Sequence, residues 1–153
     1  MLEKALILAA KAHTGQVDKG GAPYILHPIQ VMLACEGEKE KIVALLHDTL
    51  EDTALTAADL RRAGFPEEIV QAVCCLTRGQ KEDYMEYIAR ICENALAARV
   101  KYADLQDNLD IRRIPNPTER DFARIRKYEQ AMKRITRSVK GGREHGALDT
   151  GEL

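Results

Sequence analysis

Apolar residues recur at helical spacing along most of this chain. In the first segment they occupy positions 2, 5, 6, 9 and 10, which places them on one face of a helix. No segment shows the alternation of apolar and polar residues that is typical of a strand. The pattern therefore predicts an all-α fold, a compact bundle of about seven or eight helices. These helices are expected at residues 2–13, 27–36, 40–52, 56–63, 67–78, 81–94, 95–113 and 119–140.

Glycine, proline and capping residues indicate where these helices begin and end. The segment 14–24 contains three glycines and Pro23, and it is predicted to be a loop. Residues 56–59 and 118–121 both have the spacing of a capping box, in which a hydroxyl and an acidic side chain close the first turn of a helix. We therefore expect two helices to start at these threonines.

The composition is that of an ordinary globular domain of 153 residues, with 45% hydrophobic and 31% charged residues. Residues 1–140 are expected to form a single domain, and residues 141–153 a disordered tail. A net charge of -1 gives no overall attraction for nucleic acid or for a membrane. No apolar run approaches membrane-spanning length, no signal peptide is recognisable, and the four cysteines form no C-x-x-C pair. We expect a cytoplasmic monomer or small homo-oligomer that binds a small molecule.

One predicted helix changes character abruptly. After the apolar run 42–46 it presents His47, Asp48, Glu51 and Asp52 within six residues. Buried charges must be paired or must bind a metal, so this helix end is a candidate metal site. His47 and Glu51 are four residues apart and are predicted to share one face of this helix, and Asp48 and Asp52 are predicted to share the neighbouring face.

Two distant residues can complete such a site. His27 stands at the start of the preceding helix, directly after the glycine-rich loop, and Asp104 interrupts an apolar helix with Asn108 one turn later. Two imidazoles and two carboxylates form a mixed, fairly hard ligand set. That set suits Mn²⁺ or Fe²⁺, with Zn²⁺, Co²⁺ or Mg²⁺ as alternatives.

These blocks also resemble a known family. The ordered set His27-Pro28, His47-Asp48, Glu51-Asp52 and Asp104-x-x-x-Asn108 is similar to the HD superfamily of metal-dependent phosphohydrolases. The segments 13–28 and 44–53 resemble, more narrowly, the (p)ppGpp hydrolase domain of the Rel/Spo enzymes and the small alarmone hydrolases. The resemblance covers about residues 3 to 135.

The resemblance implies an all-α enzyme that binds one Mn²⁺ and removes the 3′-pyrophosphate of (p)ppGpp, giving GDP or GTP. It implies that the metal ligands are His27, His47, Asp48 and Asp104. It also implies that Glu51 and Asp52 activate water and protonate the leaving group. Asn108 is implied to lie near the 3′-phosphate, and Lys19 to face the phosphates. Lys101 is a second candidate cation for the pyrophosphate, and Tyr24 is a candidate substrate contact that could instead pack the loop.

Two departures from the family pattern leave the substrate open. Asp18 stands where the family usually has an arginine that packs on the guanine base, and Asp107 and Asp110 replace basic residues around Asn108. One alternative is therefore an HD phosphohydrolase that acts on another nucleotide, such as the 2′-phosphate of NADPH or a nucleoside monophosphate. A second alternative is a non-catalytic nucleotide-sensing module. The basic segment 119–140 is interpreted as a solvated helix face over an apolar seam.

Overall fold

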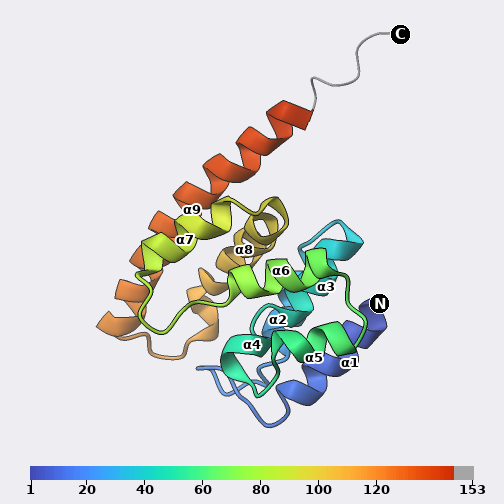
Figure 1. Ribbon diagram of the computed structural model, residues 1–153. Coiled ribbons are helices and arrows are strands. Elements are labelled where there is room, and N and C mark those ends of the chain that lie inside the picture. Colours follow the sequence, from blue (N-terminus) through green and yellow to red (C-terminus); the bar gives the residue numbers. More distant parts are fainter. Residues whose placement is uncertain (147–153) are drawn as a thin grey trace.

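The structure, a computed structural model, describes residues 1–146 of the chain, with side chains as far as residue 141. Helices make up nearly all of this part, and no strand occurs in it, only an isolated bridge between Val17 and Pro23. The predicted all-α class is therefore confirmed. In chain order the elements are α1 (Leu2–Ala12), α2 (Leu26–Leu33), α3 (Glu38–Leu46), α4 (Thr49–Asp52), α5 (Ala57–Arg62), α6 (Glu67–Leu76), α7 (Tyr84–Cys92), α8 (Ala95–Asn108), the 3-10 turn η1 (Ile111–Arg113) and α9 (Glu119–Gly146) (Figure 1).

Helices α3 and α8 form the centre of the bundle. Helix α3 packs against α1, α2, α6 and α8. Helix α8 packs against α2, α3, α6, α7 and α9. Residues 42–46 of α3 are at most 3% exposed, because neighbours cover this apolar run on every side. Alanines 97, 98 and 103 of α8 are small enough to let these neighbours approach closely. Polar side chains on α3 and α8 are therefore brought into the interior.

Several helix boundaries differ from those expected. The helix predicted at 40–52 is broken at His47 and Asp48, and the one predicted at 95–113 ends at Asn108. The break has a local cause: the side chains of His47 and Thr49 bond to the carbonyl oxygens of Ala44 and Leu46, at 2.5 and 2.7 Å. Such side-chain bonds compete with the regular helical ladder.

The two predicted capping boxes begin helices as expected. At Thr56 both reciprocal hydrogen bonds with Asp59 are present. At Thr118 the backbone N–H donates to the Asp121 carboxylate at 2.8 Å. Helix α9 then continues to Gly146, beyond its expected end at residue 140, and its distal half extends past the other helices (Figure 1). The remainder of the predicted tail, residues 147–153, lies outside the described residues.

None of the helices over residues 1–146 combines the length and apolar character needed to cross a membrane. The four cysteines are free thiols, packed in or against the core.

The loop between α1 and α2 folds around Asp18. Its carboxylate accepts hydrogen bonds from the backbone N–H groups of Gly20 and Ala22, at 2.9 and 3.0 Å. Gly21 adopts a left-handed conformation with φ of 84°, which a residue without Cβ adopts readily. A Cβ atom on Gly20 would lie 2.5 Å from the backbone oxygen of Arg113. The loop is thus packed directly on the turn that follows α8.

We expect Gly20→Ala to lower the free energy of unfolding by about 1–3 kcal/mol, because the added methyl group overpacks against a backbone atom that cannot rotate away. Gly79→Ala is the matched control, since its Cβ would make ordinary contact with Glu82 at 3.5 Å. Urea unfolding followed by circular dichroism measures both. Equal midpoints for the two variants would contradict the close approach.

Candidate metal centre and active site

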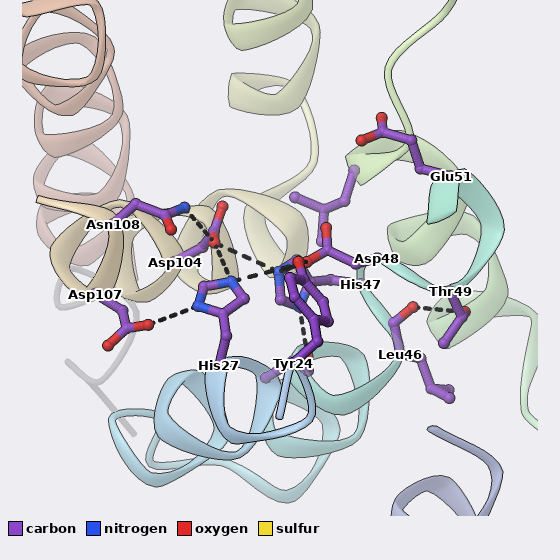
Figure 2. A network of polar contacts seen from close by, with 12 residues as sticks. Tyr24, His27, Leu46, His47, Asp48, Thr49, Glu51, Asp104, Asp107 and Asn108 are labelled. Atoms are coloured by element: carbon purple, nitrogen blue, oxygen red, sulfur yellow. Dashed lines mark hydrogen bonds and ion pairs between the residues drawn. The ribbon is translucent and has the colours of Figure 1, made fainter. Parts of the chain in front are cut away.

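Three buried side chains from three helices meet in the interior. His27 lies in the first turn of α2, His47 directly follows α3, and Asp104 lies in α8. Their ligand atoms all lie within 4.8 Å of one another. The Asp104 Oδ1 atom is 2.9 Å from Nε2 of His27 and 3.4 Å from Nε2 of His47 (Figure 2). The fold therefore brings together residues separated by 77 positions in the sequence, the interval from 27 to 104.

Asp48 adds a second carboxylate to this group. Its Oδ2 atom lies 3.1 Å from Nε2 of His47 and 3.7 Å from Nε2 of His27. The same oxygen accepts a hydrogen bond from the hydroxyl of Tyr24. The structure thus places the four predicted metal ligands close together. Tyr24, in the loop before α2, contacts one of them, Asp48.

The electrostatics of this cluster favour a bound cation. Burial disfavours a charged ring at His27, yet hydrogen bonds to Asp104 and Asp107 raise its pKa to about 9. Burial also opposes charge on His47, but Asp48 and Asp104 hold the pKa of His47 well above 6.5. Burial would raise the pKa of Asp48, and the neighbouring His47 lowers it to about 2. Each shift has the same meaning: the carboxylates stay ionised and attract positive charge.

The donor atoms themselves fit a divalent metal. Nε2 of His47 is buried and makes no well-directed hydrogen bond, although two carboxylate oxygens lie within 3.4 Å of it. A buried ring nitrogen normally has a partner, so this atom points to a ligand that the protein does not supply. Imidazole nitrogens and carboxylate oxygens are the donors expected for Mn²⁺, Fe²⁺ or Zn²⁺. The cluster is therefore a possible metal-binding site.

Lys101 and Asn108 support Asp104 from the same helix. The Lys101 ammonium lies 2.8 Å from Oδ2 of Asp104, and the Asn108 amide donates to Oδ1 at 3.0 Å. Lys101 is buried and also lies over the ring of Tyr87, 5.2 Å from its centroid. Its charge is thus engaged with Asp104, whereas the sequence had suggested a cation free to meet pyrophosphate.

Glu51 and Asp52 form a second acidic group with Asp48 on the solvent side. Their carboxylates come within 4.8 Å of that of Asp48, and both residues are exposed. Glu51 accepts a hydrogen bond from the backbone N–H of Arg78 at 2.9 Å. Partial burial and the neighbouring acids raise the pKa of both carboxyl groups. The helix break thus separates Glu51 from His47, and Glu51 lies beyond Asp48 as seen from His27 (Figure 2). The prediction that His47 and Glu51 share one helix face is therefore wrong.

A cavity of about 430 Å³ opens onto both groups. Its wall contains six basic side chains, of which only Lys19 and Lys101 were candidates from the sequence. The others come from the turn after α6, from η1 and from α9: Arg78, Arg113, Arg124 and Lys127. The interpretation of the segment 119–140 as a solvated face was therefore incomplete.

The missed side chains on α9 carried a signal in the sequence. Lys127 and Tyr128 stand three and four positions after Arg124, so both lie on the helix face of Arg124. All three line the cavity. Lys19 also lines the cavity, half exposed, with its ammonium 3.6 Å from Oδ1 of Asp121 in α9.

Asp18 does not act as the sequence suggested. A carboxylate in place of the family's arginine was expected to repel phosphate. Its Oδ1 atom instead accepts two backbone N–H groups of its own loop, which partly neutralise its charge locally. Asp18 therefore holds the shape of its own loop, and it also lines the cavity.

Known proteins resemble the chain over most of its length, although no family model matches it. It is 30% identical over 144 residues to the GTP pyrophosphokinase of Myxococcus xanthus, an alignment that covers 82% of this chain and 18% of that protein. It is 32% identical over 120 residues to the guanosine-3′,5′-bis(diphosphate) 3′-pyrophosphohydrolase of Aquifex aeolicus, covering 71% of this chain and 17% of the relative. The chain thus spans less than a fifth of the length of these curated relatives.

A solved structure extends this likeness to three dimensions. It belongs to a metazoan ortholog of SpoT that hydrolyses ppGpp and plays a role in starvation responses. The TM-score is 0.72 at 27% sequence identity, and the match covers 92% of this chain and 85% of the other. The bifunctional (p)ppGpp synthase/hydrolase SpoT of Escherichia coli is also 31% identical over 124 residues, covering 71% of this chain and 17% of that protein. With the helical fold and the ordered His and Asp blocks, these likenesses show that the chain resembles one part of the SpoT and Rel proteins, and they are consistent with an HD-type domain.

Proposed function

We propose that this domain is a Mn²⁺-dependent (p)ppGpp 3′-pyrophosphohydrolase that acts in the cytoplasm, with residues 1–140 as its hydrolase domain. The observation that carries the proposal is the convergence of His27, His47 and Asp104, with Asp48 close to both histidines and to the acidic pair, in a cavity with a basic wall. The names of the relatives support the choice of substrate, because several are guanosine-3′,5′-bis(diphosphate) 3′-pyrophosphohydrolases. His27, His47, Asp48 and Asp104 would hold the metal.

A divalent metal held there supplies Lewis acidity and lowers the pKa of a bound water. The residues on its solvent side handle the protons. The oxygen of water bonds to the phosphorus next to the ribose, and the bond from that phosphorus to the 3′-oxygen breaks. Glu51 takes up the proton that the water loses, and Asp52 delivers a proton to the departing 3′-oxygen. Their raised pKa values suit both transfers near neutral pH.

The basic wall of the cavity serves the charge of the substrate. The pyrophosphoryl group that is transferred to water carries several negative charges, which need fixed cations close by. Lys127 and Arg124 of α9 line the same cavity as the acidic pair, and so does Arg78, whose backbone N–H donates to Glu51. Asn108, Tyr24 and Lys19 also line the cavity and are proposed to contact the nucleotide.

Metal removal gives the direct test. We expect the Mn²⁺-loaded protein to convert ppGpp to GDP with one pyrophosphate released per GDP, and EDTA treatment to abolish this turnover. Adding Mn²⁺ back in excess should restore it, because metal affinity depends on ligands that remain in place. Ion chromatography of the products measures the stoichiometry.

The same assay separates the other candidate functions. Release of monophosphate from NADPH or from a nucleoside monophosphate, without pyrophosphate from ppGpp, would contradict the proposed substrate. Tight ppGpp binding without any product would instead indicate a sensing module.

A further inference from the structure

The outer nitrogen of the His27 ring is bound to an acid that lies outside the metal cluster. Nδ1 of His27 is 2.6 Å from Oδ2 of Asp107, while its Nε2 atom is 2.9 Å from Asp104. Figure 2 shows Asp107 on the opposite side of the ring from Asp104 and Asp48. An ionised carboxylate can only accept a hydrogen bond, so the proton must be on Nδ1. Nε2 is at hydrogen-bonding distance from the Asp104 carboxylate and carries the second proton of the ring. A metal at Nε2 would replace that second proton, while the proton on Nδ1 stays with Asp107.

Asp107 is itself held in place. Nη2 of Arg113 lies 3.0 Å from Oδ2 of Asp107 and donates to its backbone oxygen, also at 3.0 Å. The backbone of Arg113 in turn packs directly against Gly20 in the loop before α2. His27 is therefore supported by three connected elements: the last turn of α8, η1 and the loop at residues 14–24.

The two histidines of the cluster are supported differently. Nδ1 of His47 donates to the backbone oxygen of Ala44, which is neutral and fixed by its own helix. His27 is instead supported by a side chain that carries charge and is only partly exposed. A carboxylate partner makes the opposite ring nitrogen more electron-rich than a carbonyl partner does.

We infer that Asp107 is a positioning residue for the metal centre, orienting His27 and strengthening its Nε2 atom as a ligand. The inference rests on the proposed metal site but not on the choice of nucleotide. Asp107 does not belong to the group of ligand atoms that converge, and it acts through His27 alone.

Mn²⁺ affinity of the purified protein tests this inference. We expect Asp107→Asn to weaken Mn²⁺ binding about tenfold and Asp107→Ala up to about a hundredfold, the range found when a partner of a metal-bound histidine is removed. The matched control is Glu40→Gln. Glu40 pairs with Arg99, and the exposures of this acid and arginine, 18% and 42%, are close to those of Asp107 and Arg113, 18% and 38%. Its affinity should remain that of the wild type.

Two further measurements distinguish positioning from a structural role. The paramagnetic resonance spectrum of bound Mn²⁺ should change in Asp107→Asn and stay unchanged in Glu40→Gln, because only the first alters a ligand. The melting temperatures of the two metal-free variants should be similar. Wild-type affinity in both Asp107 variants would overturn the inference and leave the proposed hydrolase standing. Weakened affinity together with no hydrolysis of ppGpp by the wild type would overturn the proposed function and leave the role of Asp107 standing. A wild-type protein that binds no Mn²⁺ would overturn both.

Discussion

Asp104→Asn is expected to abolish Mn²⁺ binding and to lower ppGpp turnover by at least about a thousandfold. Oδ1 of Asp104 lies within 3.4 Å of Nε2 of both imidazoles, so its neutral replacement removes a charge that His27 and His47 share. Isothermal titration with Mn²⁺ and the pyrophosphate assay measure the two effects. Turnover within tenfold of the wild type would contradict the assignment of Asp104 as a ligand.

The same substitution has a second consequence, for stability. It leaves the buried ammonium of Lys101 without its anion, and breaking a buried ion pair in this way costs about 3–5 kcal/mol. The double variant Asp104→Asn with Lys101→Met should recover most of this loss in urea unfolding, because the stranded charge is removed. It should still bind no Mn²⁺, which separates the loss of the metal from the loss of stability.

The sequence predicted the fold class because its apolar residues keep one period throughout. It also predicted the metal cluster, because an acid or imidazole inside an apolar helix needs a partner. His47 follows the apolar run of α3, and Asp104 interrupts the apolar part of α8. Both helices are central, so burial forces these side chains to meet.

What the sequence could not show depends on contacts between distant elements. The break after Leu46 arises from side-chain bonds to backbone oxygens, which no periodicity records. The basic wall combines single residues from α9, η1 and the turn after α6, and none of these segments is unusual by itself. Asp107 could be recognised as a departure from a family pattern, but its contact with His27 spans 80 residues and only the folded chain reveals it.

Glu51→Gln is expected to reduce ppGpp turnover by about 10²–10⁴-fold, the usual contribution of a general base, without changing Mn²⁺ affinity. The amide keeps the size of the side chain, and its oxygen can still accept the hydrogen bond from Arg78. It cannot take a proton from water near neutral pH. Because Glu51 lies apart from the two imidazoles, its replacement should leave the ligands unaltered (Figure 2).

Glu68→Gln provides the control for removing one acidic charge, since Glu68 is exposed and pairs with Lys39 of α3 at 2.7 Å. Its turnover and Mn²⁺ affinity should both match the wild type. Loss of Mn²⁺ binding in Glu51→Gln would make Glu51 a metal ligand, and unchanged turnover would transfer the base role to Asp52. We expect Glu51→Gln to keep its Mn²⁺ affinity and to lose turnover. The break between α3 and α4 places His47 among the proposed metal ligands and Glu51 at the cavity, where water and substrate enter.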